Sequence, residues 1–463
     1  GNSVSVNLYT SDPNVEGIFA DNSVKYSAIE GGMAGEGNIT LNSENEGTDD
    51  VNYPMFAEPS IAAGCDYTGG DWTLQEGSVC IGHGNNEYVE GAYDLAHEVR
   101  VRQYTVDMGA YESPYDQEFE IAPDANNIIY VTENGAGDMD GSSWADATPY
   151  LQYAMERAAL MNPKPVIWVA AGSYHGEGVP QYPAFILPKG VSIYGGFAGD
   201  EPATYNLDDR DFDINISYLD GQNMQQILRH DENNPSSQYD HIDGFTFQNG
   251  RSNRSGGAAN LVGCLVDNCK FYNNAAIDEG GNNIFGGALK MSNTEVYRSE
   301  FVGNYANVDG GAIYGSGIVS HSLIKDNRAD RNGGGVNGGA KLYDCEISYN
   351  TAEKGGGIFN CGTMRNCTVV KNNAALTTGG TSDNGGGIYR MSSSDGFGGS
   401  VANLYTNNII WGNKTGALVS NIRMAPGAGA MTYSAVERDE VMPTGMGNIV
   451  IESINDGSDN ALV

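Results

Sequence analysis

The sequence predicts an all-β parallel β-helix, because the same two half-repeats recur along 256–415 at a nearly constant interval. Six Gly-Gly doublets open the first half-repeat: GGAA (256–259), GGAL (286–289), GGAI (310–313), GGGV (333–336), GGGI (355–358) and GGGI (385–388). The second half-repeat reads apolar-x-x-Cys/Ser/Asn-x-apolar-x-x-Asn-x-small, and its Asn residues at 304, 327, 350 and 372 are 23, 23 and 22 residues apart. A repeat of this length is typical of a solenoid.

The content of each repeat favours short strands over a helical or leucine-rich solenoid. Apolar residues lie two apart in runs such as Cys345/Ile347 and Cys367/Val369, and Gly and Asn bound these runs. Stacked coils bring equivalent residues into columns about 4.8 Å apart. We therefore expect an Asn ladder in a turn, where Asn tolerates αL, and a Gly-Gly corner that excludes a Cβ or needs positive φ. The Cys/Ser column is expected to be a stack of small inward side chains.

A short helix is predicted near 149–161, before the regular coils. Thr148 is placed as the N-cap and Pro149 as the first helical residue. The apolar positions that share one face are Leu151, Ala154, Met155, Ala158 and Ala159. We expect this helix to cover the end of the β-helix, because a terminal coil otherwise presents unpaired backbone and an open core.

Composition excludes several classes of function. The 463 residues carry a formal net charge of −35, and the pI is near 4.2, which argues against binding nucleic acid or an anionic membrane surface. A solvated acidic surface explains this charge, with Ca²⁺ binding as the alternative, and no motif requires a cofactor. No segment reaches the roughly 20 apolar residues of a transmembrane helix. The seven cysteines cannot all pair with one another; Cys269, Cys345 and Cys367 are expected as buried thiols, and pairing of Cys65 with Cys80 is left open.

Several runs near the start of the predicted β-helix resemble one known family. They are YVTENGAGDMDGSSWADAT (130–148), WVAAGSYHG (168–176), VSIYGGFAGDE (191–201) and RDFD (210–213). These runs look like the opening of pectin-lyase-like right-handed parallel β-helix proteins exported by Bacteroidetes, and GGAI with FVGN (301–304) is similar to repeats of chlamydial polymorphic outer-membrane proteins. The resemblance covers about 128–455. It implies a right-handed β-helix and a location outside the cell or on the outer-membrane surface of a Gram-negative bacterium, without implying an activity.

The two ends of the sequence repeat one another. Residues 26–39 read YSAIEGGMAGEGNI and residues 433–449 read YSAVERDEVMPTGMGNI. Residues 53–113 resemble the closing segment of the same family, which is often followed by a choice-of-anchor module. We interpret 1–113 as the closing segment of one β-helix unit, 114–127 as a linker, and 128–463 as the right-handed β-helix of the next. Either the chain is part of a tandem array, with end-to-end packing of further units, or 1–113 packs on the last coil as a permuted end.

Candidate catalytic and metal-binding residues are few. The densest acidic cluster is Asp208, Asp209, Asp211 and Asp213 around Arg210. Its simplest interpretation is a solvated turn held by an Asp–Arg pair, and its alternative is a carboxylate pair of a glycoside hydrolase. Asp138 and Asp140 form a fragment of a Ca²⁺ loop that lacks the later acidic ligand. The six histidines have no spacing that indicates zinc.

Two longer intervals between doublets predict a groove. The insertions 277–285 and 375–384 fall at the same point of the repeat, four coils or about 19 Å apart, and only short links separate them. We expect them to be walls of a groove for an extended ligand, such as a polysaccharide or a cell-surface glycan. The candidate residues are Asp278, Glu279, Asn282 and Asn283 on one wall, Thr381 and Asp383 on the other, and Asp309, Arg331, Asn332 and Lys354 on the floor.

These observations favour a non-catalytic, exported β-helix protein that presents an extended surface for adhesion or glycan binding. Two alternatives follow from the same residues. One is a polysaccharide lyase or glycoside hydrolase, which needs converging carboxylates or a Ca²⁺ cluster with a neighbouring base. The other is a structural spacer in a tandem surface fibre.

Overall fold

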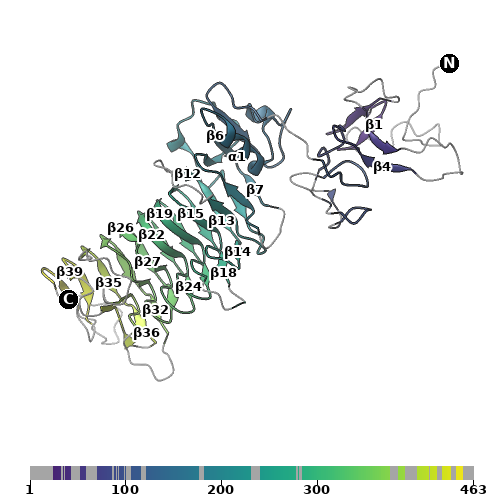
Figure 1. Cartoon of the computed structure of the whole chain (residues 1–463). Coiled ribbons are helices and arrows are strands. Elements are labelled where there is room, and N and C mark those ends of the chain that lie inside the picture. The colour runs from purple at the N-terminus through teal and green to yellow at the C-terminus, as the bar shows by residue number, and fades with distance from the viewer. Residues whose placement is uncertain are drawn as a thin grey trace, which may run out of the picture. The chain divides into compact units, whose positions relative to one another are not determined.

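A computed structural model of the chain describes residues 24–32, 35, 37–42, 53–58, 70–85, 88–89, 91, 93–98, 100, 106–115, 121–176, 182–230, 240–277, 280, 284–375, 384–391, 404–416, 418–424, 430–438 and 445–451. The chain divides into two units, Gly1–Glu120 and Ile121–Val463. The boundary between them falls inside the predicted linker 114–127. The two units, here unit 1 and unit 2, are described separately (Figure 1).

Unit 2 is a parallel β-helix, as the repeats predict. Among the described residues its strands form three sheets, of eighteen, eleven and eight strands. The first sheet holds β5 (Ile128–Val131), β6 (Val166–Ala170), β8 (Phe185–Leu187), β9 (Ser192–Phe197), β11 (Leu228–His230), β12 (Asp240–Asp243), β15 (Ala259–Val262), β16 (Cys264–Asp267), β19 (Leu289–Tyr297), β22 (Ile313–Ser320), β25 (Val336–Asn337), β26 (Lys341–Tyr343), β29 (Ile358–Phe359), β30 (Met364–Arg365), β33 (Ile388–Arg390), β34 (Leu404–Thr406), β38 (Ile422–Met424) and β39 (Ala430–Thr432).

The second and third sheets complete each coil. The second holds β7 (Gly172–Tyr174), β10 (Ser217–Asp220), β13 (Phe245–Gln248), β17 (Lys270–Tyr272), β20 (Glu300–Val302), β23 (Leu323–Lys325), β27 (Glu346–Ser348), β31 (Thr368–Val370), β35 (Ile409–Trp411), β40 (Ala435–Glu437) and β41 (Ile449–Ile451). The third holds β14 (Arg251–Ser252), β18 (Ala275–Ala276), β21 (Tyr305–Ala306), β24 (Arg328–Ala329), β28 (Thr351–Ala352), β32 (Asn373–Ala374), β36 (Lys414–Thr415) and β37 (Leu418–Val419), of which the last pair is antiparallel.

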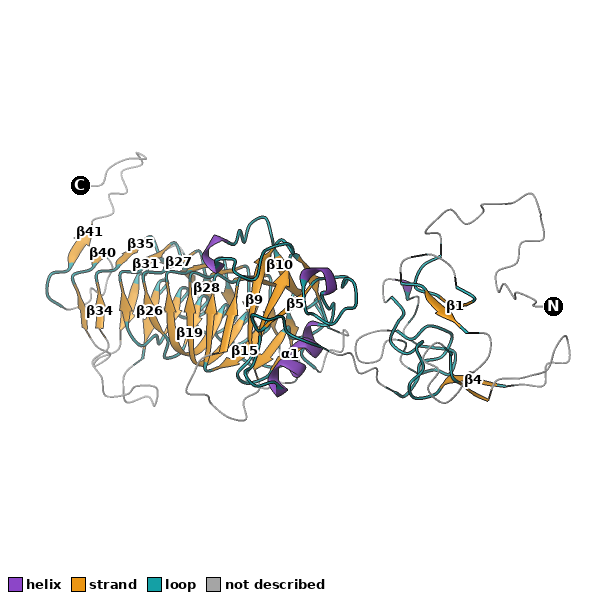
Figure 2. Cartoon of the chain, turned by 90° about the horizontal axis from the view of Figure 1, so that it is seen from above, coloured by secondary structure: helices purple, strands orange, loops and turns teal. Residues whose placement is uncertain are grey.

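Equivalent residues of successive coils stack in register along the β-helix (Figure 2). In the second sheet Phe271 pairs with Phe301, and Phe301 pairs with Ile324. The rings of Phe271 and Phe301 stack at 4.6 Å, and Phe247 stacks on Phe271 at 4.7 Å. These inward residues are fully buried and belong to one continuous core. The period-2 apolar pattern of the sequence therefore marks the inward faces of the strands.

The predicted helix is present, but it starts later than the sequence suggested. The helix α1 spans Leu151–Leu160, with Tyr150 at the N-cap position and no side-chain cap. The assignment of Thr148 as N-cap is wrong, because Thr148 lies in a parallel bridge with Val131 of the first coil. The helix buries Leu151, Ala154, Met155 and Ala158 as predicted, and it contacts β5, β6 and β8 at the first coils (Figure 2).

Both glycines of each doublet are needed, for different reasons. The first adopts positive φ, as in Gly310 (φ 69°) and Gly333 (φ 65°). The second is crowded by the backbone of the next coil: a Cβ on Gly311 would lie 2.1 Å from the carbonyl oxygen of Gly334. The two explanations predicted for the corner therefore apply one to each glycine.

The predicted Asn column is a buried amide ladder. Its members are Asn274, Asn304, Asn327, Asn350, Asn372 and Asn413. Asn327 shows the repeating pattern: its side-chain nitrogen donates to Phe301 O and to Asn350 Oδ1, both at 2.9 Å. Its side-chain oxygen accepts from the backbone and side-chain nitrogens of Asn304, again at 2.9 Å. Each amide therefore joins three coils.

The αL residue of this turn is the one before the ladder Asn. Positive φ occurs at Asn273, Asp326, Tyr349 and Lys371, with values of 55–58°. The expectation that the ladder Asn itself adopts αL is therefore wrong. The ladder Asn is required for its hydrogen bonds. The residue before it adopts the positive φ, and because its side chain is exposed, its type can vary between coils.

The Cys/Ser column is inward and buried, as predicted, and it forms a second ladder. Cys269 N donates to Ser299 Oγ and Ser299 N donates to Ser322 Oγ, both at 3.2 Å. Farther along, Asn408 N donates to Ser434 Oγ and Ser434 N to Asn448 Oδ1, both at 3.1 Å. Cys269, Cys345 and Cys367 are buried free thiols, and burial raises the pKa of the Cys269 thiol. Cys80 is also free, whereas Cys65 lies outside the described residues.

Unit 1 has a small core of its own. Its strands are β1 (Ala28–Glu30) and β2 (Ile39–Leu41), which pair in parallel, and β3 (Phe56–Glu58) and β4 (Asp71–Leu74), which pair antiparallel. Leu41, Leu74, Cys80 and Ile81 form the buried cluster, and Ile39 and Phe56 pack against it. Leu74, Cys80 and Ile81, which follow β2 in the chain, thus pack in one cluster with Ile39 and Leu41 of β2.

Substitution of one ladder amide tests its contribution to stability. Asn327→Ala leaves the backbone and side-chain nitrogens of Asn304 and the carbonyl oxygen of Phe301 without their partner in a site that excludes water. We expect a loss of about 3 kcal/mol in the free energy of unfolding, measured by chemical denaturation. Ser316→Ala, on an exposed position of β22, is the control and should change it by less than about 0.5 kcal/mol.

Two glycine substitutions test the crowded corner. Gly311→Ala places a Cβ against the backbone of the next coil, so we expect a loss of several kcal/mol or no soluble protein, on the order of the cost of overpacking. Gly339→Ala is the matched control, because its Cβ would meet no atom closer than 3.9 Å. This variant should unfold at nearly the same denaturant concentration as the wild type. Equal behaviour of the two variants would contradict the steric account.

Candidate functional site

The predicted floor residues lie at one corner of the β-helix, just before the Gly-Gly doublets. Isolated parallel bridges link Phe285 to Asp309, Asp309 to Asn332, and Asn332 to Lys354. The floor therefore consists of successive coils in register. The wall residues Asp278, Glu279, Asn282, Asn283, Thr381 and Asp383 lie outside the described residues, so the groove itself stays a prediction.

Three floor residues form one ion-paired cluster. Arg331 Nε and a terminal guanidinium nitrogen lie 2.9 Å from the two oxygens of Asp309, a bidentate geometry. Asn332 Nδ2 donates to Asp309 Oδ1 at 2.9 Å. These bonds to Asp309 raise the pKa of Arg331. Asp309 is buried, whereas half of the Arg331 side chain is exposed. The cluster thus offers a fixed, solvent-facing guanidinium edge beside Lys354.

An aromatic stripe adjoins this floor, and the sequence interpretation missed it. Phe285 stacks on Tyr314 at 4.3 Å with an interplanar angle of 15°, and Phe359 stacks on Tyr389 at 5.2 Å with an angle of 8°. Tyr314, Asn337, Phe359 and Tyr389 are register partners in successive coils of the first sheet. Tyr314 and Phe359 are thus two coil steps, or about 10 Å, apart.

A signal for this stripe is present in the sequence. Tyr314, Asn337, Phe359 and Tyr389 are each the fourth residue after the first glycine of a doublet, at the first position of the repeat that faces away from the core. Asn260 and Lys290 hold the same position after the first two doublets, so three of the six residues in this column are aromatic. Phe359 and Asn337 are buried, whereas Tyr314 and Tyr389 are partly exposed. Three rings within four successive coils could have marked this face as a candidate for binding.

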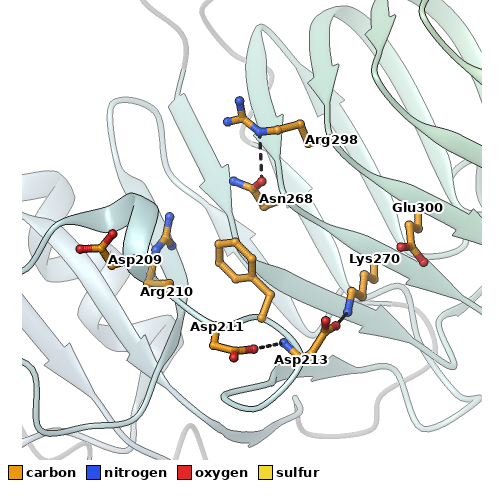
Figure 3. A pocket seen from close by; sticks show the side chains of 9 residues that line it. Asp209, Arg210, Asp211, Asp213, Asn268, Lys270, Arg298 and Glu300 are labelled. Carbon is orange, nitrogen blue, oxygen red and sulfur yellow. Dashed lines mark hydrogen bonds and ion pairs between the residues drawn. The ribbon is translucent and has the colours of Figure 1, made fainter.

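A second candidate is a polar pocket of about 420 Å³ beside the acidic turn. It is lined by Asp209, Arg210, Asp211, Phe212, Asp213, Asn268, Lys270, Arg298 and Glu300 (Figure 3). Lys270 Nζ lies 2.5 Å from Asp213 Oδ1 and lowers the pKa of that carboxyl. Tyr272 donates to Glu300 at 2.7 Å, and Arg298 pairs with Asp267. The pocket brings together the predicted acidic turn and residues from the neighbouring coils β17 and β20.

Arg210 anchors the acidic turn, but its partner lies outside that turn. Its guanidinium is 2.9 Å from Asp243 Oδ2 and donates to the carbonyl oxygens of Gly195 and Leu207 at 2.8 Å. It also lies over the rings of Phe197 and Phe212, 5.4 and 5.0 Å from their centroids. Arg210 therefore forms an ion pair with an aspartate, as predicted. Its partner is Asp243, however, and not one of the aspartates of the acidic turn.

Of the two candidate calcium ligands, Asp140 accepts through its carboxylate, whereas Asp138 donates through its backbone. Asp146 Oδ1 accepts from Asp138 N at 3.3 Å, and Asp140 Oδ1 accepts from Ser142 N at 2.8 Å. No group of three His, Cys, Asp or Glu side chains is arranged to hold a metal ion within the part of the chain that the structure describes. Among those same residues, no helix has the length and apolarity to span a membrane.

The architecture defines the class: this is a parallel β-helix protein with a corner of stacked aromatic and ion-paired residues. Comparison with family models, with curated proteins and with solved structures finds no significant match to the chain.

Two arginines of the pocket should differ in their contribution to stability. Arg210 and Asp243 have side chains only 2% and 14% exposed, so Arg210→Met leaves the Asp243 carboxylate without its cation, with only the hydrogen bond from Asn268, and should cost about 3 kcal/mol of unfolding free energy. Arg298 is 60% exposed, so Arg298→Met should cost less than about 1 kcal/mol. Urea denaturation of both variants measures the difference. Equal losses would mean that the buried pair does not anchor the turn.

Proposed function

We propose that this chain belongs to an exported, non-catalytic β-helix protein that binds an extended glycan at the bacterial surface. The observation that carries the proposal is the aromatic stripe beside the floor cluster. Ligand sites typically combine aromatic faces with a few fixed polar groups. Here Tyr314 and Tyr389 supply the faces, and Arg331 and Asn332, both held by Asp309, supply the polar groups.

The spacing of the two ring pairs suits a chain-like ligand. Their equivalent members, Tyr314 and Tyr389, lie three coil steps apart, about 14 Å, which is longer than one sugar ring. A polysaccharide lying along the β-helix axis would thus meet both pairs, whereas a single sugar would meet only one. Export and a surface location rest on the resemblance of residues 130–213 to the opening of pectin-lyase-like β-helix proteins. The net charge of −35 makes an anionic membrane or nucleic acid a poor partner.

A glycan array, probed with and without Ca²⁺, followed by affinity measurement on any hit, tests the proposal. Tyr314→Ala with Tyr389→Ala removes one ring from each stacked pair and should weaken binding roughly tenfold or more. Tyr182→Ala is the matched control, because Tyr182 is 63% exposed and lies in the early coils. Unchanged affinity in the double variant would exclude the stripe as the binding surface.

Cleavage of a glycan is the second candidate, and the pocket beside Asp213 and Glu300 is the observation that favours it. The pocket places carboxylates next to Lys270, and acidic and basic side chains are the groups that a hydrolase or a lyase uses. A product assay on each bound glycan separates the candidates. New reducing ends or unsaturated products would establish an enzyme, and intact ligand would support binding alone.

A further inference from the structure

The repeated sequence at the two ends of the chain folds into the same coil. In unit 1, β1 and β2 pair in parallel with Ala28 opposite Ile39 and Ile29 opposite Thr40. In unit 2, β40 and β41 pair with Ala435 opposite Ile449 and Val436 opposite Val450. The tyrosine before each pair adopts positive φ, 46° at Tyr26 and 50° at Tyr433.

The hydrogen bonds of the two coils also match. Ser27 N donates to Asn38 Oδ1 at 3.1 Å, as Ser434 N donates to Asn448 Oδ1 at 3.1 Å. Asn38 Nδ2 donates to Val24 O at 2.9 Å, and Asn448 Nδ2 donates to Met431 O at 2.9 Å. The described residues of 24–41 therefore form a β-helix coil, and its Ser27–Asn38 hydrogen bond repeats the Ser434–Asn448 step of the inner ladder.

The coil at the end of unit 2 presents a strand edge. Among the described strands, β41 is the last of the second sheet (Figure 2). Ile449 N donates back to Ser434 O at 2.9 Å, and Ile451 O accepts from Arg438 N at 2.8 Å. Because neighbouring residues of a strand point their backbone groups to opposite sides, the N–H and C=O of Val450 face the free edge. Ile449 and Val450 are 65% and 40% exposed, so this edge is apolar, and among the described strands none pairs with it.

The coil in unit 1 presents the opposite edge. Ser27 O accepts from Ile39 N at 2.9 Å, and Gly31 N donates to Leu41 O at 3.0 Å, so these groups face β2. The N–H and C=O of Ala28 consequently face the other way. In unit 2 the equivalent Ala435 N donates to Asn408 O of the preceding coil at 2.8 Å. Ser27 Oγ donates to Lys25 O at 3.0 Å, as Ser434 Oγ does to Thr432 O at 3.0 Å, and Ser434 Oγ also accepts from the preceding coil.

We propose that unit 1 of a second copy of this chain docks on β41 and continues the β-helix, with β41 and β1 pairing in parallel. In the register of β35 and β40, Val450 N–H donates to Ala28 C=O, and Asn448 N–H donates to Ser27 Oγ. The interface joins two different surfaces, so it repeats head to tail and allows association beyond a dimer. This association goes beyond glycan binding and does not depend on it.

The dimensions of unit 2 favour a second copy as the partner. The second sheet has ten strand steps between β7 and β41, or about 48 Å. Ile121 is buried in the core, and the adjacent Ala122 N donates to Asp140 O at 2.9 Å, next to the first coil. Six residue steps connect Tyr115 to Ile121, and fully extended they span at most about 22 Å. The connection alone therefore spans less than half of the distance along this sheet, which favours β41 of a second copy as the docking site.

Sedimentation of the full chain over about a hundredfold range of concentration tests the proposal. The average mass should rise above the 49.2 kDa of one chain as concentration increases. Val450→Pro removes the edge N–H without breaking a bond to β40, and Ala28→Pro does the same on β1. Each variant alone should stay a monomer. An equimolar mixture should form a dimer of twice 49.2 kDa, because each variant keeps the edge that the other lacks.

The controls make each outcome informative. Ile214→Asp changes an apolar side chain that is 77% exposed on a turn, and it should associate like the wild type. A monomeric wild type at every concentration overturns the proposal, and so does association of Val450→Pro alone. A wild-type monomer that becomes less compact with Val450→Pro would assign the edge to the chain's own unit 1. Association that appears only after removal of residues 1–23 would assign the β1 edge to that segment, against the proposal.

Discussion

The spacing between stacked coils is the constraint on which the rest of the structure depends. Parallel strands pair at about 4.8 Å, so each residue sits directly above its equivalent in the coil below. At the Gly-Gly corner this spacing leaves no room for a Cβ on Gly311 beside Gly334 O. At the Asn turn the same spacing lets Asn327 bond the coils on both sides. Residue identity is therefore most strictly set at the corners, where backbone approaches backbone.

Variation is confined to positions that face away from the core. The turn residue before the ladder Asn can be Asn273, Asp326, Tyr349 or Lys371, all with positive φ. Insertions at the corner before the doublets lengthen a coil without shifting the strands on either side. The aromatic stripe and the floor cluster occupy this variable side of the same corner. A solenoid can thus change its binding surface coil by coil while its core stays constant.

The sequence predicted what repeats and missed what does not. The Asn ladder, the two glycines and the inward Cys/Ser column recur six times, so the repeats themselves display them. The αL turn was misplaced by one residue, because Tyr349 and Lys371 carry no αL signature. The type and spacing of Thr148 predict a helix cap, but Thr148 instead forms an isolated parallel bridge with Val131. The partner of Arg210 is Asp243, 33 residues away, and local sequence holds no record of such a contact.

The candidate site shows the same contrast between residues that the repeat places and residues that it does not. The structure brings Asp309, Arg331 and Asn332 together, since their positions at one point of the repeat place them in adjacent coils. The repeat motif does not predict the aromatic stripe, because it is defined by inward residues and the outward position differs in type between coils. Stacking nevertheless brings aromatic residues at one position of adjacent coils together, as Phe359 and Tyr389 stack at 5.2 Å. In a β-helix, residues of one type that recur at one outward position stack along the axis. Recurring aromatic residues therefore form a row of stacked rings.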